Sequence, residues 1–256
     1  MNLKLLRAAL LGAVCLATLA AAAAAAAPDD APGAAFPKGH YGALNALPDW
    51  GGVWTLNFGG PRAPRERPEL KGQYLADYQA WQHEVQEKHG EVARAASYCR
   101  PPGMPGIMGQ PYPMEFLLTP GLVTIVIEAY TQVRHIYTDG RPLPDDPDPK
   151  FHGTSIGHWE GDTLVVETVG FSPQTDIAGN TPHSDKMKIV ERFRLADPDT
   201  MTIETTVTDA EALAAPWVSN RTLRRHRAWT IAEYICEENN RNSVDSNGKA
   251  AINIKK

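Results

Sequence analysis

Short runs in which apolar and polar residues alternate make up most of the chain after residue 113. A period of two places successive side chains on opposite faces, as in a β-strand with one buried face. Turn signals such as Pro-Gly, Asp-Gly and Glu-Gly-Asp separate the runs. Together with one earlier run, they predict strands within residues 48–58, 114–119, 122–138, 155–160, 163–171, 188–196, 200–208, 220–229 and 231–237.

One segment has the period of a helix instead. In the sequence from Leu70 to Ser97, the apolar residues Leu75, Tyr78, Trp81 and Val85 recur at spacings of three and four, which predicts a helix that ends near residue 98. The next segment, CRPPGMPGIMGQPYP at 99–113, holds too many prolines and glycines for a regular element. We predict a surface segment that packs across the domain as a rim or lid.

Many short strands at hairpin spacing with one N-terminal helix indicate a mainly β protein, an antiparallel barrel of about eight strands or a sandwich. A barrel of that size has an interior wide enough for one small ligand. We place this single domain at residues 48–240 and predict a C-terminal tail at 241–256.

The N-terminus is predicted to be a targeting segment. Lys4 and Arg7 precede an apolar stretch and an alanine run, the pattern of a secretory signal peptide over residues 1–27. Residues 28–47 are rich in Pro, Gly and Ala and are predicted to be a flexible lead-in. No later window resembles a membrane span. The mature protein is therefore expected to be periplasmic or secreted.

The stretch HGTSIGHWEGDTLVVETVGF at 152–171 reads as a hairpin, because Gly161 supplies the backbone conformation that a tight turn requires. His152, His158 and Glu167 lie among its apolar residues. Glu160 and Asp162 are expected to be solvated residues of the turn. The pattern leaves open whether the hairpin also forms one wall of a reactive site.

Glu191 is the first charged residue that alternation places on an apolar face. It shares that face with Met187, Ile189, Phe193 and Leu195. A buried carboxylate must be paired, hydrogen-bonded or protonated. A carboxyl group with a raised pKa suits general acid or base catalysis. The alternative is an ion pair with an arginine across the sheet.

The long apolar run at 122–137 yields further candidates. If this predicted strand bends or contains a bulge, its faces exchange, and Tyr130, Arg134 or His135 then points inward. Alternation alone does not distinguish among the three.

Three other residues are candidates by their surroundings. Glu115 lies between Met114 and Phe116, His183 precedes the predicted strand of Glu191, and His158 lies in the hairpin. For each histidine, the alternative is a structural residue.

Composition and motifs exclude several classes. The chain has 25 Lys and Arg against 30 Asp and Glu, and no basic block, which argues against a nucleic-acid partner. The zinc signature HExxH is missing, as are CxxC, GxSxG and GxGxxG. The acidic loop at 139–149 contains oxygen ligands that suit calcium but lacks the EF-hand pattern, so a solvated loop is the alternative. These ligands are Asp139, Asp145, Asp146 and Asp148.

Two cysteines, Cys99 and Cys236, remain after removal of a signal peptide that contains Cys15. An oxidising compartment allows them one pairing. We therefore predict a disulfide that connects the proline-rich segment to the last predicted strand.

Several longer strings resemble a family of exported proteins from Gram-negative bacteria whose members are mostly of unknown function. The strings are CRPPGMPGIM, PYPMEFLLTPGLVTIV, QVRHIYTDGRPLP, SIGHWEGDTLVVETVGF, HSDKMKIVERFR and YICEENN. The resemblance covers residues 48–240 and implies a calycin-like or lipocalin-like barrel. The chain is also similar to glutathione-independent hydrolases that cleave β-aryl ethers in lignin-derived dimers. This second resemblance implies that the protein can bind calcium and can form a homo-oligomer.

We therefore expect a hydrolase or lyase that acts on a small aromatic ether without an organic cofactor. Glu191 or Glu115 is the expected base. His183 or His158 protonates the departing aryl oxide, and Arg134 or Tyr130 stabilises its charge. The alternatives are a lipocalin-like carrier of a small apolar ligand and a structural envelope protein. Several converging interior ionisable groups favour an enzyme, an apolar cavity favours a carrier, and a structural protein has no pocket.

Overall fold

Nine β-strands form a closed barrel in the computed structural model of the protein, which describes residues 41–59, 67–90, 92, 99–236, 243–244 and 250–251. Each strand pairs with the next one along the chain, and the first strand closes the ring by pairing with the last. The barrel strands are β1 (Val53–Leu56), β2 (Met114–Thr119), β3 (Leu122–Ile127), β4 (Gln132–Tyr137), β5 (Thr154–Glu160), β6 (Thr163–Val169), β7 (Lys188–Asp197), β8 (Thr200–Thr208) and β9 (Trp217–His226).

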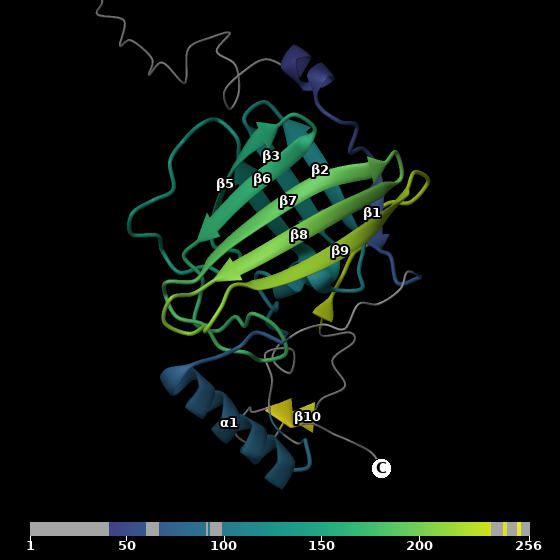
Figure 1. Ribbon diagram of the computed structural model, residues 1–256. Helices are drawn as coiled ribbons and strands as arrows, with labels where there is room; N and C mark the ends of the chain where they lie inside the picture. Colours follow the sequence, from purple (N-terminus) through teal and green to yellow (C-terminus); the bar gives the residue numbers. More distant parts are fainter. Residues whose placement is uncertain are drawn as a thin grey trace, which may run out of the picture. The chain divides into compact units, whose positions relative to one another are not determined.

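The barrel follows from the alternation of the sequence. Along β7 and β8, every second residue is buried over most of the strand, so each strand has one face in the core and one toward solvent. Figure 1 shows β7, β8 and β9 side by side as long strands of the barrel wall. The mainly β barrel is thus confirmed, with nine strands rather than about eight.

The expected antiparallel pairing holds at every joint except that between β4 and β5. These strands run parallel and pair through two positions only, Ile136 with Ser155 and Tyr137 with Ile156. A parallel pair needs a crossover connection, and residues 138–153 provide it. The chain therefore returns to the start of β5 before it forms the predicted hairpin of β5 and β6, which turns at Gly161 (φ 63°).

The prediction of one long strand over residues 122–138 is wrong, because the chain reverses direction in the middle of it. A short 3₁₀ helix, η5 (Ala129–Thr131), joins β3 to β4, which pair antiparallel. Tyr130 and Thr131 adopt positive φ angles of 56° and 51° there. A non-glycine residue rarely takes this conformation, so alternation gives no sign of the turn.

Large aromatic side chains fill the core of the domain. Trp50, which precedes β1, lies 5.5 Å from Phe116 and 6.2 Å from Phe193 between ring centroids. The Trp54 indole N–H donates to the backbone carbonyl of Trp50 at 3.0 Å. Apolar residues from all nine strands join this core, so packed side chains occupy space in which a ligand-holding barrel would have a cavity.

The predicted helix is present as α1 (Gly72–Glu87), which ends earlier than expected. None of its residues is buried. Tyr74 and Tyr78 lie partly against the core, and Trp81 stacks on Tyr78 at 5.7 Å between ring centroids. Leu75, one of the apolar residues that predicted the helix, is exposed. The spacing of apolar residues therefore predicted the helix correctly, but these residues do not form a buried face.

The proline-rich segment is part of the core, contrary to the prediction of a surface rim or lid. Met104, Ile107 and Met108 are fully buried around the short helix η4 (Gly106–Gly109). Gly103 has φ 68°, and a Cβ atom there would lie 2.6 Å from the carbonyl oxygen of Phe151. Glycine is therefore required where this segment packs against residue 151.

Other predicted segments fall at the ends of the chain. The signal peptide at 1–27 lies outside the described residues, as do most of the lead-in and of the C-terminal tail. The last residues of the lead-in form the helix η2 (Tyr41–Ala46), and two short strands of the tail, β10 (Ser243–Val244) and β11 (Ala250–Ala251), pair with each other. Within the described ranges, no helix has the length and apolar character needed to cross a membrane.

The predicted disulfide between Cys99 and Cys236 is confirmed, with a Cα–Cα distance of 5.7 Å. The predicted strand at 231–237 is wrong, because residues 231–235 form no strand. Instead, this segment lies on the β3–β4 turn. The Ala232 amide donates to the Glu128 carboxylate at 2.9 Å, and the Thr131 hydroxyl donates to the Tyr234 carbonyl at 3.0 Å.

The disulfide should stabilise the protein through its long loop. The cysteines are 137 residues apart, and closing such a loop restricts the unfolded chain by about 5 kcal/mol in the entropic model. We expect a variant with both Cys99→Ala and Cys236→Ala to lose about 3–5 kcal/mol of unfolding free energy in urea. Hydrogen exchange should become faster first at Ala232, while Met104 stays protected because it is buried. An unchanged urea midpoint would contradict this expectation.

Candidate functional site

A buried ion pair between Glu191 of β7 and Arg134 of β4 lies inside the barrel. The two side chains are 0% and 1% exposed, and the Arg134 Nη2 group donates to Glu191 Oε2. The same Nη2 donates to the hydroxyls of Ser155 at 3.3 Å and Thr168 at 3.2 Å. These two hydroxyls are 2.9 Å apart. A buried charge requires such pairing, so the four side chains form one polar unit in an otherwise apolar core.

The strand register explains how these residues meet. On β7, Ile189, Glu191 and Phe193 are buried on one face, as the alternation predicted. Ser155 and Thr168 are direct partners across the β5–β6 hairpin. Arg134 reaches the interior because the turn at η5 starts β4 on a new phase of alternation, in which Arg134 and Ile136 are buried and His135 is exposed.

Some polar atoms of this unit form no hydrogen bond with any described residue. Arg134 Nε, Arg134 Nη1 and Glu191 Oε1 are buried without a hydrogen-bond partner in the described part of the chain. Buried polar groups are nearly always hydrogen-bonded, and an unmade bond costs about 1–3 kcal/mol. The unit therefore has donors and an acceptor that can bind a further polar group.

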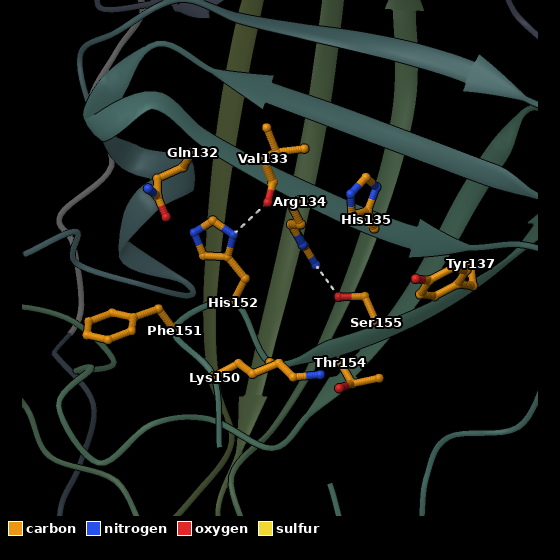
Figure 2. A pocket seen from close by; sticks show the side chains of 11 residues that line it. Gln132, Val133, Arg134, His135, Tyr137, Lys150, Phe151, His152, Thr154 and Ser155 are labelled. Atoms are coloured by element: carbon orange, nitrogen blue, oxygen red, sulfur yellow. Dashed lines mark hydrogen bonds between the residues drawn. The ribbon is translucent and has the colours of Figure 1, made fainter. Parts of the chain in front are cut away.

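A cavity of about 330 Å³ adjoins this unit, in the range typical of small-ligand sites. It lies beside the short joint of β4 and β5, between β4 and residues 150–155. Figure 2 shows Arg134 extending from β4 toward Ser155, with His152 and Lys150 on the opposite side of the gap. The shortness of the parallel joint thus creates an opening in the barrel wall beside buried charge.

His152 is the second reactive group at this cavity. Its Nδ1 atom donates to the Val133 carbonyl at 3.3 Å, which leaves Nε2 as the unprotonated nitrogen of the neutral ring. Burial, and next the positive charge of Arg134, lower the pKa of His152 from 6.5 to about 4. Nε2 has no hydrogen-bond partner among the described residues. His152 therefore has a neutral imidazole at neutral pH, with a buried and unpaired lone pair on Nε2.

Four of the predicted site residues are not among those that line the cavity, namely His183, His158, Glu115 and Tyr130. His183 is buried, but its ring nitrogens contact the Thr175 hydroxyl at 2.9 Å and the Ser184 carbonyl at 2.7 Å. His158 is exposed and lies 3.2 Å from Glu160. Both histidines thus have polar partners within the protein itself.

Glu115 and Tyr130 are also placed elsewhere. Glu115 is half-buried on the other face of β2, because its sequence neighbours Met114 and Phe116 point into the core. Tyr130 packs its ring 5.3 Å from that of Tyr234 between centroids. Burial raises the pKa of Tyr130 above its usual value, so its hydroxyl stays protonated.

Sequence reasoning singled out Glu191 and Arg134 but missed Ser155, Thr168 and the importance of His152. Thr168 is in the buried row of β6 with Leu164 and Val166, so a polar residue on that face was a usable signal. The local pattern placed His152 and His158 alike among apolar residues and did not distinguish them, because the position of His152 depends on the crossover before β5.

Comparison with known proteins does not assign this chain to a family, since no family model and no curated protein matches it. The resemblance to exported barrels and ether hydrolases therefore remains a prediction. Within the described residues, no group of three or more His, Cys, Asp or Glu side chains is arranged to hold a metal ion. In the acidic loop, Asp139 is paired with Arg141, whose Nη2 donates at 2.7 Å.

Breaking the buried pair from one side should be more harmful than removing it. We expect Arg134→Met to lower the unfolding free energy by about 3–5 kcal/mol, because it leaves a buried carboxylate without its partner. Adding Glu191→Leu should restore much of this loss. Urea unfolding of the two single variants and the double variant measures the coupling.

The exposed pair of Arg192 and Glu160, with side chains 43% and 48% exposed, provides a matched control. Arg192→Met should change stability by less than about 1 kcal/mol. If the double variant loses the sum of the two single losses, the interpretation of Arg134 and Glu191 as one unit is wrong.

His152 should make the protein less stable in mild acid. Its pKa is about 4 in the folded protein and near 6.5 in the unfolded chain, so the unfolded chain binds the proton first as the pH falls. We expect about 2 kcal/mol of unfolding free energy to be lost between pH 7 and pH 5 through this group. His152→Asn keeps a donor for the Val133 carbonyl and should show a smaller loss over this range. Identical pH dependence in both proteins would contradict the assignment.

Proposed function

We propose that the protein is a hydrolase or lyase that acts on a small aromatic substrate in the cavity between β4 and β5. The observation that carries the proposal is the convergence of a neutral imidazole, an arginine with unused N–H groups and the Ser155 hydroxyl at one opening in the barrel wall. A base beside a fixed positive charge is what general acid/base cleavage requires.

The chemistry assigns a role to each side chain. His152 Nε2 accepts a proton from water as the water oxygen attacks the carbon of a C–O bond. That bond breaks and leaves its electron pair on the aryl oxide, whose charge Arg134 stabilises. The imidazolium then returns the proton to the oxide, so an ether and water give a phenol and an alcohol. Because Glu191 is engaged with Arg134, we assign it the role of holding the guanidinium rather than that of the base.

Two features favour a catalyst over a carrier of an apolar ligand. The ionisable residues Arg134, Lys150 and His152 all line the cavity, whereas the pocket of a carrier is expected to contain few polar groups. Packed aromatic rings also occupy the core of the barrel, where a lipocalin-like protein would hold its ligand. Phe151 and Tyr137 line the cavity and suit an aromatic substrate.

The β-aryl ether bond of lignin-derived dimers is the specific substrate we propose, on the basis of the sequence resemblance. The reaction as written needs no organic cofactor. A disulfide between Cys99 and Cys236 supports an oxidising compartment, and we propose a periplasmic or secreted location.

The assay is release of a phenol from both diastereomers of a β-aryl ether dimer by the purified mature chain across a pH series. We expect release above pH 5, where His152 is unprotonated. His152→Gln should lower the rate at least about 100-fold, as expected for the loss of a general base. The control is His83→Gln, which changes an exposed histidine of α1. No release from either diastereomer would refute the substrate, and full activity of His152→Gln would refute the base.

A further inference from the structure

The cavity between β4 and β5 is lined by basic side chains and by no acidic ones. Arg134, His135, Lys150 and His152 are among its lining residues, which include no Asp or Glu. In the whole chain, acidic residues outnumber Lys and Arg by 30 to 25. The lining thus departs from the overall charge of the protein, and a cleft with charges of one sign attracts the opposite charge.

Two groups at the cavity have the capacity to bind an anion. Arg134 uses Nη2 for Glu191, Ser155 and Thr168, while Nε and Nη1 are buried and remain without a partner among the described residues. Glu191 balances the charge of Arg134, so the net positive charge comes from Lys150. Within the described ranges, Lys150 forms no ion pair. Hydrogen bonds from cationic donors to a carboxylate are about twice as strong as neutral ones.

Aromatic side chains lie at the same opening. Phe151 is next to Lys150 and His152 in sequence, and Figure 2 shows its ring at the left of the view, below Gln132. Tyr137 lines the other end, where the Arg141 guanidinium lies 3.8 Å from the centre of its ring. A ligand that combines a flat ring with one negative charge fits both the polar and the apolar parts of this lining.

We infer that the cavity binds a small aromatic carboxylate, with the carboxylate at Arg134 and Lys150 and the ring beside Phe151. The inference deepens the proposed function and rests on it only in using the same cavity. The inference specifies the ligand class as an aromatic ring with an anionic group. Ether cleavage by itself does not require that the substrate carry a negative charge.

Benzoate and benzamide are matched probes, because they have nearly the same shape and differ in charge. Calorimetric titration of the full mature chain should give benzoate at least about tenfold tighter binding than benzamide. Lys150→Gln should weaken benzoate binding by about three- to fivefold and leave benzamide unchanged, as expected for loss of a partly exposed charge. The control is Lys186→Gln, which changes an exposed lysine that pairs with Asp185 and does not line the cavity.

A second measurement locates the site and does not depend on the variants. Benzoate should shift the backbone amide resonances of Gly153 and Ser155 in a nitrogen-15 correlation spectrum, with a smaller effect on Gly72 at the start of α1. Equal binding of the two probes, or no binding of either, would overturn the inference. Equal weakening by Lys150→Gln and Lys186→Gln would also overturn it.

The two proposals fail separately. Preferential benzoate binding without phenol release upholds the anion site and refutes ether cleavage. Phenol release from a neutral dimer without any preference for benzoate upholds ether cleavage and overturns the anion site.

Discussion

The pairing of Arg134 with Glu191 is the constraint around which the interior of this barrel is arranged. A buried charge is tolerated only with a partner, so β4 and β7 must present these two residues to the same interior region. Ser155 and Thr168, from the two strands of the hairpin between them, also accept hydrogen bonds from Nη2. Four strands therefore meet at one polar unit, and the same unit supplies the unused donors of the cavity.

The geometry of the barrel wall turns this structural unit into a candidate site. Because β4 and β5 pair through only two positions, the first half of β4 has no strand beside it on that side. Residues 150–153 cross this gap and place His152 against the Val133 carbonyl. Gly153 makes the close approach possible, since its φ is 65° and a Cβ atom there would lie 2.6 Å from the carbonyl oxygen of Val169. The same crossover thus accounts for the parallel joint, the opening and the low pKa of the imidazole.

The alternation of apolar and polar residues predicted features that depend on a single strand. It failed for features that depend on how two segments of the chain pack together. Alternation alone predicted that Glu191 lies on a buried face. The disulfide was predicted because only two cysteines lie outside the predicted signal peptide. The inward position of Arg134 depends on a reversal at Tyr130 and Thr131, two non-glycine residues with positive φ, which no turn signal announces. The buried position of Met104 depends on a segment far away in the sequence, since its amide donates to the Phe151 carbonyl at 2.8 Å.

The closure of the barrel by β1 and β9 has a consequence for how the protein folds. Val53 pairs with His226, so the ring joins residues from opposite ends of the domain. Contacts of such long sequence separation form slowly, since the entropy of closing the loop must be overcome first. Until β9 is in place, β1 and β8 each have an open edge. The folding chain is therefore most exposed to wrong strand pairing before β9 closes the ring, a hazard that the finished barrel removes.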